Sequence, residues 1–420
     1  MNVKMMNALI DERKDELFKI LCDLVKINSE NFGDHGNEEE CARFIHKLCQ
    51  DMGLESDLYS PLDIDGFTEC EDYYPGRNLE KRYNVAARWK GTEDKDELML
   101  MGHHDTVPIG DPANWSFEPL LGEVRDGKIL GRGACDDKYA LATVMFLIKI
   151  LKEKGFKPRA NLVFASYSDE EFGGSHGAMA SVMKYPCTRI VNLDGRYAQI
   201  WHCASGGGEM CFKYHTVNTV DSAKLTAKVI PIIMEEIDKF ADNRSAELEE
   251  NRFYKGTIIP KTSLRYLDVH AGNNGSDLGV GSVNFVFYTV KTKEEIYKEL
   301  EEVTKRINER INPLGVVGDG FFPTTRYFHY GFSEPDHESI KDMVRVAKDA
   351  IGEDVMVCGS CLSDLSVILK YGNNSAYGFG AGRDFSLPGG AHQPNEFIEC
   401  ESLVKFAKMV GAYMIDFLGE

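Results

Sequence analysis

The chain of 420 residues has few basic side chains for its size and no long uninterrupted hydrophobic run. Lysine and arginine total 48 against 67 aspartates and glutamates, which gives a net charge of −19. So acidic a surface repels phosphate backbones and anionic lipids, and this argues against binding to nucleic acid or to a membrane surface. An apolar stretch at residues 141–150 is too short and too interrupted to span a bilayer.

The N-terminal residues 1–27 lack the apolar core of a secretory signal, because charged residues are spread through them. The 11 cysteines, an odd number, lack the even spacing of a disulfide framework. Both features favour a cytoplasmic protein in a reducing compartment. Cys358 and Cys361 form one CxxC pair, which we interpret as two ordinary thiols because a zinc knuckle needs a second pair nearby.

Internal repeats and low-complexity segments are also absent from the sequence. Hydrophobic residues make up 43% and charged residues 27%, values that exclude a disordered chain, a collagen and a small disulfide scaffold. The length predicts two to three domains, or one large domain with an insertion.

The first half of the chain alternates between helical and strand patterns. Apolar spacing predicts amphipathic helices at 8–28 and 38–52. Short apolar runs bounded by turns predict strands at 84–89, 97–102, 161–167 and 189–193, with a helix at 138–153. This alternation is typical of an α/β sheet with a large parallel component.

The pattern changes near residue 196. Three glycines at 206–208 precede a strand, and the next hundred residues predict a helix near 221–241, strands near 264–269 and 283–290, and a helix at 293–311. The chain breaks at 312–315, and a helix at 338–351 and a strand at 375–380 follow. We expect an α/β catalytic domain, with a largely parallel mixed sheet flanked by helices, interrupted by a smaller α/β sandwich. The expected segments are 1–195, 196–315 and 316–420.

Histidines and carboxylates follow several predicted strands, at the edge where α/β sheets bind ligands. In GHHDTVP, His103 and Asp105 point the same way along an extended segment. Asp105 can therefore hold the His103 ring while the other ring nitrogen binds a metal. His104 faces away, and we interpret it as structural. The alternative for this motif alone is a surface loop.

Two acidic clusters follow. Asp136 and Asp137, in GRGACDDK, lie at the predicted start of a helix, where N-capping is the alternative to metal binding. Asp169, Glu170 and Glu171 follow the strand NLVFASY. Three consecutive acids repel one another unless a cation or solvent relieves them, so a solvated turn is the alternative there.

Asp194 in NLDG and His392 in GGAHQPNE complete the set of candidate metal ligands. Taken by itself, the NLDG motif would be interpreted as an Asp-Gly turn. Asn395 and Glu396 follow His392 closely. Together the motifs supply two histidines and three carboxylates, which suit zinc, manganese or cobalt better than calcium or copper. One shared carboxylate would let five ligands hold two metals, which generate a hydroxide near neutral pH and polarise a carbonyl.

The motifs GHHDTVP, GEVRDGKILGRGACDDK, SDEEFGGSHGA, NLDG and GGAHQPNE, in this order, resemble those of one family. It is the di-zinc amidohydrolase and metallopeptidase family of acetylornithine deacetylase, succinyl-diaminopimelate desuccinylase, carboxypeptidase G and the Xaa-His dipeptidases. The resemblance covers both halves of the catalytic domain and is weak across the inserted domain.

The resemblance implies a role for each metal ligand. His103 and Asp194 would bind one divalent ion, Glu171 and His392 would bind the other, and Asp136 would bridge the two. The ions would be zinc, with cobalt or manganese as alternatives. The peptide bond after Asp136 is commonly cis in this family.

The resemblance also implies how an amide bond would be cut. Glu170 would be the general base, taking a proton from the metal-bridging water and delivering it to the leaving nitrogen, while Asp105 holds His103. We expect a metallohydrolase, either a deacylase or a dipeptidase or carboxypeptidase, acting on an N-acyl amino acid or a small peptide. A catalytically silent metal-cleft binding protein and a two-metal phosphoesterase are the alternatives.

The inserted domain resembles the family's lid, which often also forms a homodimer interface. His215 and His270 are the candidates for the lid histidine that binds the oxyanion, with a structural histidine as the alternative for either. Lys291 stands near the place of the lid arginine that grips a substrate carboxylate. Arg383 is a candidate for binding that carboxylate, and a surface arginine is the alternative. The acyl group, the amino acid and the native metal stay open.

Overall fold

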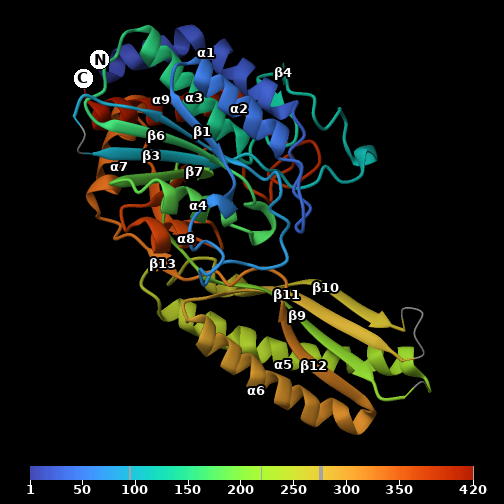
Figure 1. The fold of residues 1–420 in the computed structure, drawn as a ribbon. Helices are drawn as coiled ribbons and strands as arrows, with labels where there is room; N and C mark the ends of the chain where they lie inside the picture. The colour runs from blue at the N-terminus through green and yellow to red at the C-terminus, as the bar shows by residue number, and fades with distance from the viewer. Residues whose placement is uncertain (94–95, 219, 274–277, 420) are drawn as a thin grey trace. The chain divides into compact units, whose positions relative to one another are not determined.

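The computed structural model describes residues 1–93, 96–218, 220–273 and 278–419 (Figure 1). The chain forms two compact units. The first comprises Met1–His202, Phe332–Cys358 and Val367–Glu420, and the second comprises Cys203–Gly331 and Gly359–Ser366. The second unit is therefore inserted into the sequence of the first.

A mixed sheet forms the centre of the first unit, in the strand order β1-β2-β6-β3-β7-β15-β8-β13, with β14 paired to β8. Its strands are β1 (Glu55–Tyr59), β2 (Asn84–Trp89), β3 (Glu97–His103), β6 (Asn161–Tyr167), β7 (Arg189–Tyr197), β8 (Gln199–Ala204), β13 (Gly331–Phe332), β14 (Met356–Ser360) and β15 (Tyr377–Gly380). The central strands β6, β3, β7 and β15 run parallel, whereas β1, β2 and β8 are antiparallel to their neighbours.

The central strands are buried on both faces of the sheet. On β3, Leu98 and Leu100 belong to the core that the sheet shares with the large helices, while Met99 and Met101 are buried outside that core. Alternate residues of a strand point to opposite faces, so both faces of β3 are covered. This two-sided burial explains why the sequence of these strands reads as continuous apolar runs.

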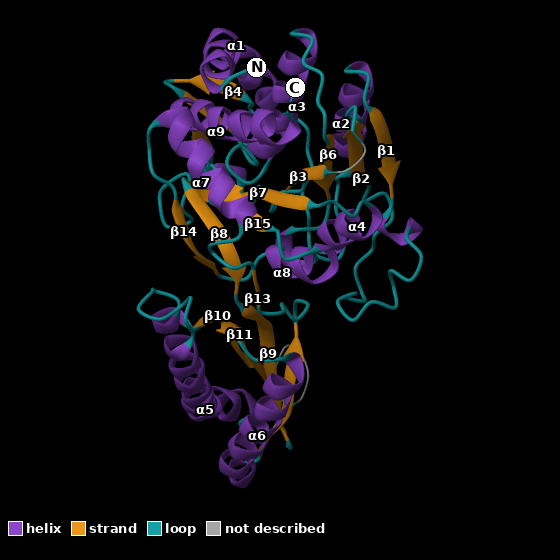
Figure 2. Ribbon diagram, turned by 90° about the vertical axis from the view of Figure 1, so that its left-hand side faces the viewer, coloured by secondary structure: helices purple, strands orange, loops and turns teal. Residues whose placement is uncertain are grey.

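Helices cover both faces of this sheet. They are α1 (Val3–Val25), α2 (Glu39–Asp51), α3 (Lys138–Glu153), α4 (His176–Lys184), α7 (Glu338–Ile351) and α9 (Cys400–Leu418), whereas the short α8 (Leu365–Val367) begins in the segment that belongs to the second unit. Figure 2 shows α1, α3 and α9 gathered on one side of the sheet and α4 on the other. The helices predicted at 138–153 and 338–351 are confirmed as α3 and α7. Within the described residues, no helix has the length and hydrophobicity of a membrane span.

A small sheet in the order β16-β5-β4 lies apart from the main one. Its strands are β4 (Glu123–Arg125), β5 (Lys128–Leu130) and β16 (Phe397–Glu399). Because β16 pairs with β5, the segment after His392 is tied to the segment before Asp136. These are two of the predicted ligand-bearing loops.

The second unit contains an antiparallel sheet in the order β10-β11-β9-β12. Its elements are β9 (Gly206–Thr216), α5 (Ser222–Glu250), β10 (Leu264–Gly272), β11 (Val280–Thr289), α6 (Lys293–Ile311) and β12 (Val316–Pro323). Figure 1 shows α5 and α6 on one face of this sheet, and their apolar residues, such as Ile233 and Val303, pack with Phe212 and Phe285. This is the α/β sandwich that the sequence predicts.

The second unit extends beyond the expected boundary at residue 315. The strand β12 follows that residue and pairs with β9, with Phe321 opposite Phe212. The break that the sequence shows there is a short 3-10 turn, Asn312–Leu314, closed by Gly315 at a φ of 79°. A left-handed glycine reverses the chain, so the segment returns into the same sheet rather than leaving the unit.

Glu236 anchors α5 to α6 in this unit. Its side chain is 3% exposed, and it accepts hydrogen bonds from Lys239 Nζ at 2.7 Å, Arg306 Nε at 2.9 Å and Arg310 Nη1 at 2.7 Å. Burial alone would raise the pKa of Glu236, but these three cations lower it to about 2. A carboxylate whose pKa is depressed by folding stabilises the protein above its unfolded pKa, and this contribution is lost as the pH falls through the folded pKa.

We therefore expect Glu236→Gln to lower the free energy of unfolding by about 3 kcal/mol at pH 7 and by less than about half of that at pH 3. Urea unfolding at the two pH values measures the difference. Glu235→Gln is the matched control, because the Glu235 side chain is 55% exposed and its ion pair with Arg310 is a surface pair. Equal losses for Glu236→Gln at both pH values would contradict the account.

Candidate metal centre

The predicted metal ligands come from five places in the first unit. His103 ends β3, Glu171 follows β6, Asp194 lies in β7, Asp136 immediately precedes the N-cap residue of α3, and His392 lies in the loop before β16. The strands β6, β3 and β7 are adjacent and parallel, so their carboxyl ends meet at one edge of the sheet. The other two ligands are brought to that edge by the small sheet and its flanking loops.

The five side chains form two groups that share one residue. One group is His103, Asp136 and Asp194, and the other is Asp136, Glu171 and His392; within each group the ligand atoms lie within 4.8 Å of one another. Nε2 of His103 is 3.1 Å from Oδ1 of Asp136, and Nε2 of His392 is 3.3 Å from Oδ2. A single carboxylate therefore lies between the two imidazoles and offers one oxygen to each.

The electrostatics of this cluster fit a cation site. Burial alone would lower the pKa of His392, but Glu171 and Asp136 raise it to about 11. Burial would likewise lower the pKa of His103, and hydrogen bonds to Asp105 and Asp136 instead raise it well above its ordinary value. The carboxylates thus strongly favour positive charge between them, and imidazole with carboxylate is a ligand set for zinc, cobalt or manganese.

Asp105 connects the end of β3 to the acidic loop after β6. Its backbone oxygen lies 3.0 Å from Nδ1 of His103, and its Oδ1 lies 3.5 Å from the same nitrogen. Oδ2 accepts the backbone N–H groups of Glu170 and Glu171, each at 3.0 Å, and the Asn31 amide at 2.8 Å. Burial would raise the pKa of Asp105, but His103 and its other donors hold it well below the ordinary range. The prediction that Asp105 faces His103 agrees with this geometry, and its contact with the Glu170 loop is new.

Glu170 lies beside the ligands. Its carboxylate forms a third cluster with His103 and Glu171, in which the ligand atoms are again within 4.8 Å of one another. Unlike Glu171, which is buried and whose Oε1 also accepts the backbone N–H of Val107 at 3.0 Å, Glu170 is partly exposed. The two adjacent glutamates therefore occupy different environments.

Asp169 is neutralised by cations from another part of the chain. It lies 2.6 Å from Nδ1 of His176, 2.9 Å from Arg82 and 3.2 Å from Arg77, and it is fully buried. Its φ is 59°, so the loop turns there in a left-handed conformation. Arg77 also donates to the carbonyl of Phe172. The predicted repulsion among the three acids is relieved at Asp169 by arginines that no sequence pattern marks.

Two of the alternative interpretations from the sequence are wrong: side-chain capping of the helix after GRGACDDK and an Asp-Gly turn in NLDG. Asp137 is the N-cap residue of α3, but its side chain makes no capping bond; Oδ2 instead accepts the backbone N–H of His103 at 3.3 Å. The peptide between Asp136 and Asp137 is cis. The strand β7 continues through Asp194 to Tyr197, so no Asp-Gly turn forms there. His104 is buried, with its pKa lowered by burial to about 3, and it stays a neutral structural residue.

The predicted substrate contacts lie on both units. Arg383, in the first unit, donates from Nε to the carbonyl of Pro388 at 3.2 Å, and its guanidinium lies over the Phe397 ring at 4.5 Å. In the second unit, Nδ1 of His215 lies 2.9 Å from Asp319, and His270 is half-buried in β10. A role of any of them in substrate binding stays a prediction.

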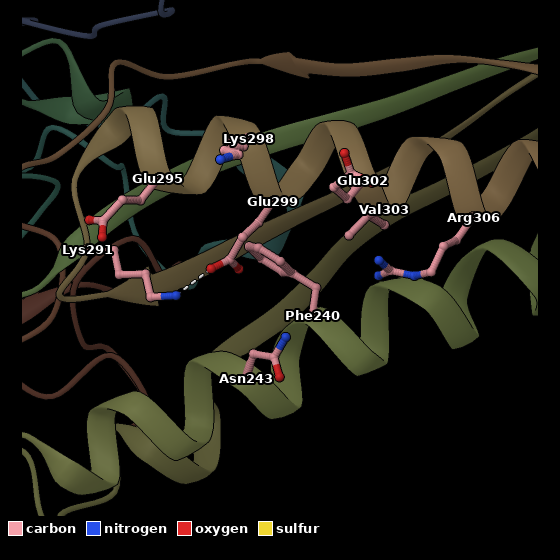
Figure 3. A pocket seen from close by; sticks show the side chains of 9 residues that line it. All are labelled: Phe240, Asn243, Lys291, Glu295, Lys298, Glu299, Glu302, Val303 and Arg306. Carbon is pink, nitrogen blue, oxygen red and sulfur yellow. Dashed lines mark hydrogen bonds and ion pairs between the residues drawn. The ribbon is translucent and has the colours of Figure 1, made fainter.

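Lys291 lies in the second unit, in a pocket of about 330 Å³ between α5 and α6 (Figure 3). Figure 3 shows its ammonium group pointing toward Glu299, with which it forms an ion pair. The lining mixes lysine and arginine with several glutamates. In this structure Lys291 is thus neutralised by Glu299 of α6, the helix that begins two residues after it.

A model of the peptidase family M20/M25/M40 matches residues 99–416. The chain belongs to this family. The resemblance drawn from the motifs is therefore confirmed, and the matched residues include all five predicted ligands. The chain is a metallohydrolase of the family.

Relatives of the family align with half or more of the chain. An uncharacterised metallohydrolase of Methanocaldococcus jannaschii is 25% identical over an alignment of 427 positions, which covers 94% of this chain and 98% of the relative. A succinyl-diaminopimelate desuccinylase of Acinetobacter baylyi is 28% identical over 239 residues, 53% of this chain and 61% of the enzyme.

Solved structures of the family share the fold. Human carnosine dipeptidase 1 superposes with a TM-score of 0.70 at 14% identity, over 99% of both chains. The dipeptidase Dug1p of Saccharomyces cerevisiae gives a TM-score of 0.71 at 15% identity, over 98% of both chains. A dinuclear metal-binding peptidase of Bacillus subtilis gives 0.59 at 14% identity. The mixed α/β fold is thus the fold of this family.

Proposed function

We propose that this chain is a two-metal hydrolase that cleaves the amide bond of an N-acyl amino acid or a small peptide. The observation that carries the proposal is the position of Asp136, which belongs to both ligand groups and presents a separate oxygen to each histidine. Zinc is the metal we propose, with cobalt or manganese as substitutes, because the ligands are imidazoles and carboxylates.

The ligand roles follow from the two groups. His103 and Asp194 would hold one ion, Glu171 and His392 the other, and Asp136 both. Two divalent ions held in this way would lower the pKa of a bound water and polarise the substrate carbonyl.

Glu170 would move the proton in this reaction. Its carboxylate lies beside His103 and Glu171, one from each ligand group, and would therefore be within reach of a water held between the two groups. It would take a proton from that water onto a carboxylate oxygen and deliver it to the leaving nitrogen. Asp105 would orient the His103 ring and, through the backbone N–H of Glu170, hold the base in place.

Two other functions are less well supported by the site. A catalytically silent binding protein has no need of a partly exposed Glu170 beside a complete ligand set, so the presence of that residue favours an enzyme. A two-metal phosphoesterase could use the same ions. The desuccinylase and dipeptidases among the relatives favour amide hydrolysis over phosphate-ester hydrolysis.

A metal-supplemented activity screen tests the proposal. Purified protein with zinc, cobalt or manganese is assayed on N-acetyl, N-succinyl and N-carbamoyl amino acids, on dipeptides and on a phosphate ester. We expect hydrolysis of at least one amide and none of the ester. Ester cleavage alone would favour the phosphoesterase, and complete inactivity with two bound ions would favour the binding protein.

We also propose that the second unit forms a homodimer interface and acts as a lid. β10 is an edge strand of its sheet, and Leu267 and Val269 on β10 are 44% and 39% exposed. An exposed apolar edge strand can pair with a second copy of itself. Size-exclusion chromatography with light scattering of the wild type and of a Val269→Lys variant tests this, and we expect the variant to be monomeric.

The proposed compartment is the cytoplasm. All eleven cysteines, which lie in the described part of the chain, are free thiols. So many free thiols in one chain are typical of a protein in a reducing compartment.

A further inference from the structure

Glu396 is a buried carboxylate that belongs to neither ligand group. Its side chain is 1% exposed, and each of its carboxylate oxygens has its own donor. Oε2 accepts from Nη1 of Arg132 at 2.6 Å, and Oε1 accepts the backbone N–H of Cys135 at 2.9 Å. Its backbone carbonyl accepts the N–H of Gly131 at 2.9 Å. Glu396 therefore accepts three hydrogen bonds from the segment before Asp136.

Arg132 extends the contact back to the loop that carries His392. Its Nη1 also donates to the carbonyl of Gln393 at 3.3 Å, and its Nη2 donates to the carbonyl of Pro108 at 3.4 Å. The guanidinium lies 5.2 Å from the centre of the Trp115 ring. Arg132 and Glu396 thus join the segment after Asp105, the segment before Asp136 and the segment after His392.

The loop that carries His392 needs external support. His392 and Asn395 both adopt a φ of 63°, a left-handed conformation that costs free energy in non-glycine residues. The surrounding contacts must fix such a loop, and pairing of β16 with β5 begins only at Phe397, beyond it. Between His392 and that strand, the Glu396 carboxylate is the charged group in contact with the Asp136 segment.

We infer that Glu396 is a positioning residue that, with Arg132, sets the separation between the bridging carboxylate of Asp136 and the imidazole of His392. The inference rests on the proposed function, because it assigns these two side chains to metal binding. Partners behind metal ligands orient those ligands, and their loss typically weakens metal affinity about 10–100-fold.

Glu396→Gln is the sharpest test, because it keeps the size of the side chain. A carboxylate has two acceptor oxygens, whereas a carboxamide has one acceptor oxygen and one donor nitrogen. The variant therefore loses either the Arg132 contact or the Cys135 contact. Titration of the metal-free protein with Co²⁺, followed by visible absorbance and calorimetry, should give two binding steps in the wild type. In Glu396→Gln we expect the dissociation constant of one step to rise about 10–100-fold while the other changes little.

Two further variants make the result specific. Glu399→Gln is the control, because Glu399 lies only three residues further along, at the end of β16, and its side chain is 43% exposed; it should bind like the wild type. Arg132→Lys should reproduce the one-step loss, since an ammonium group cannot replace the fork that contacts Glu396 and Pro108. Excess Co²⁺ should restore the activity of Glu396→Gln, which a general loss of folding would not allow.

Other outcomes would overturn the inference. Wild-type affinities in both Glu396→Gln and Arg132→Lys would show that the contact does not position the ligands. Equal weakening of both steps, with a lowered Tm and no rescue by Co²⁺, would show a structural role only. Failure of the proposed function is distinguishable, because the wild type itself would then bind fewer than two ions or hydrolyse no amide with both ions bound.

Discussion

Glu170→Gln is expected to lower kcat by about 10²–10⁴-fold while two metal ions remain bound. Glutamine keeps the shape of the side chain but cannot accept a proton from water at neutral pH. The backbone of residue 170 would stay in place, because its N–H is bonded to Oδ2 of Asp105. Steady-state kinetics, with metal content measured on the same sample, checks both parts of the prediction.

The adjacent residue supplies a matched comparison. Glu171 contacts Nε2 of His392 at 2.9 Å and belongs to one ligand group with Asp136. Glu171→Gln should therefore lose affinity for one ion as well as activity, whereas Glu170→Gln should lose activity alone. If Glu170→Gln hydrolysed a substrate as fast as the wild type, the assignment of the general base would be wrong.

Asp136→Asn is expected to have the second large effect. The carboxylate presents Oδ1 to His103 and Oδ2 to His392, and an amide would replace one of these oxygens with an NH₂ group that cannot bind a cation. We expect at most one ion to stay bound. The resulting loss of several kcal/mol of transition-state stabilisation predicts a fall in kcat/KM of at least about 10³-fold.

Metal analysis and kinetics of Asp136→Asn measure this effect. Asp126→Asn is a suitable control, because Asp126 is exposed in the turn between β4 and β5 and its φ of 51° is one that asparagine also adopts. The control should keep both ions and full activity. Two tightly bound ions in Asp136→Asn would show that the carboxylate is not the bridge.

The ligand cluster could be predicted from the sequence because its chemistry is local to short motifs. His103 ends a buried strand, Glu171 lies four residues after the end of another, and Asp194 lies within a third, where the apolar pattern is easy to read. Parallel neighbouring strands then bring their carboxyl ends together. The resemblance to the family added the roles, which spacing alone left open.

The support around the cluster could not be predicted in the same way. Arg77 and Arg82 neutralise Asp169 from a segment with no helix or strand pattern, and Glu396 contacts Arg132 across 264 residues of sequence. Pairings of this kind depend on how loops pack, and a single sequence carries no periodic signal for them. The nearest hint for Glu396 is its place four residues after His392.

The boundary of the inserted unit was misplaced for a similar reason. Asn312, Pro313 and Gly315 read as a break between domains, because proline and left-handed glycine commonly end an element. In the structure the same residues make a tight turn into β12, which pairs with β9. A turn and a linker share this composition, and only the pairing of the following strand distinguishes them.

The number of metal ions per chain tests the central claim most directly. Protein stripped with a chelator is reconstituted with Zn²⁺, Co²⁺ or Mn²⁺, and bound metal is measured by mass spectrometry alongside hydrolysis of an amide substrate. The account predicts two ions per chain, no activity in the stripped protein, and full activity only when both ions are bound. One ion or none at saturation, or undiminished activity in the stripped protein, would contradict it.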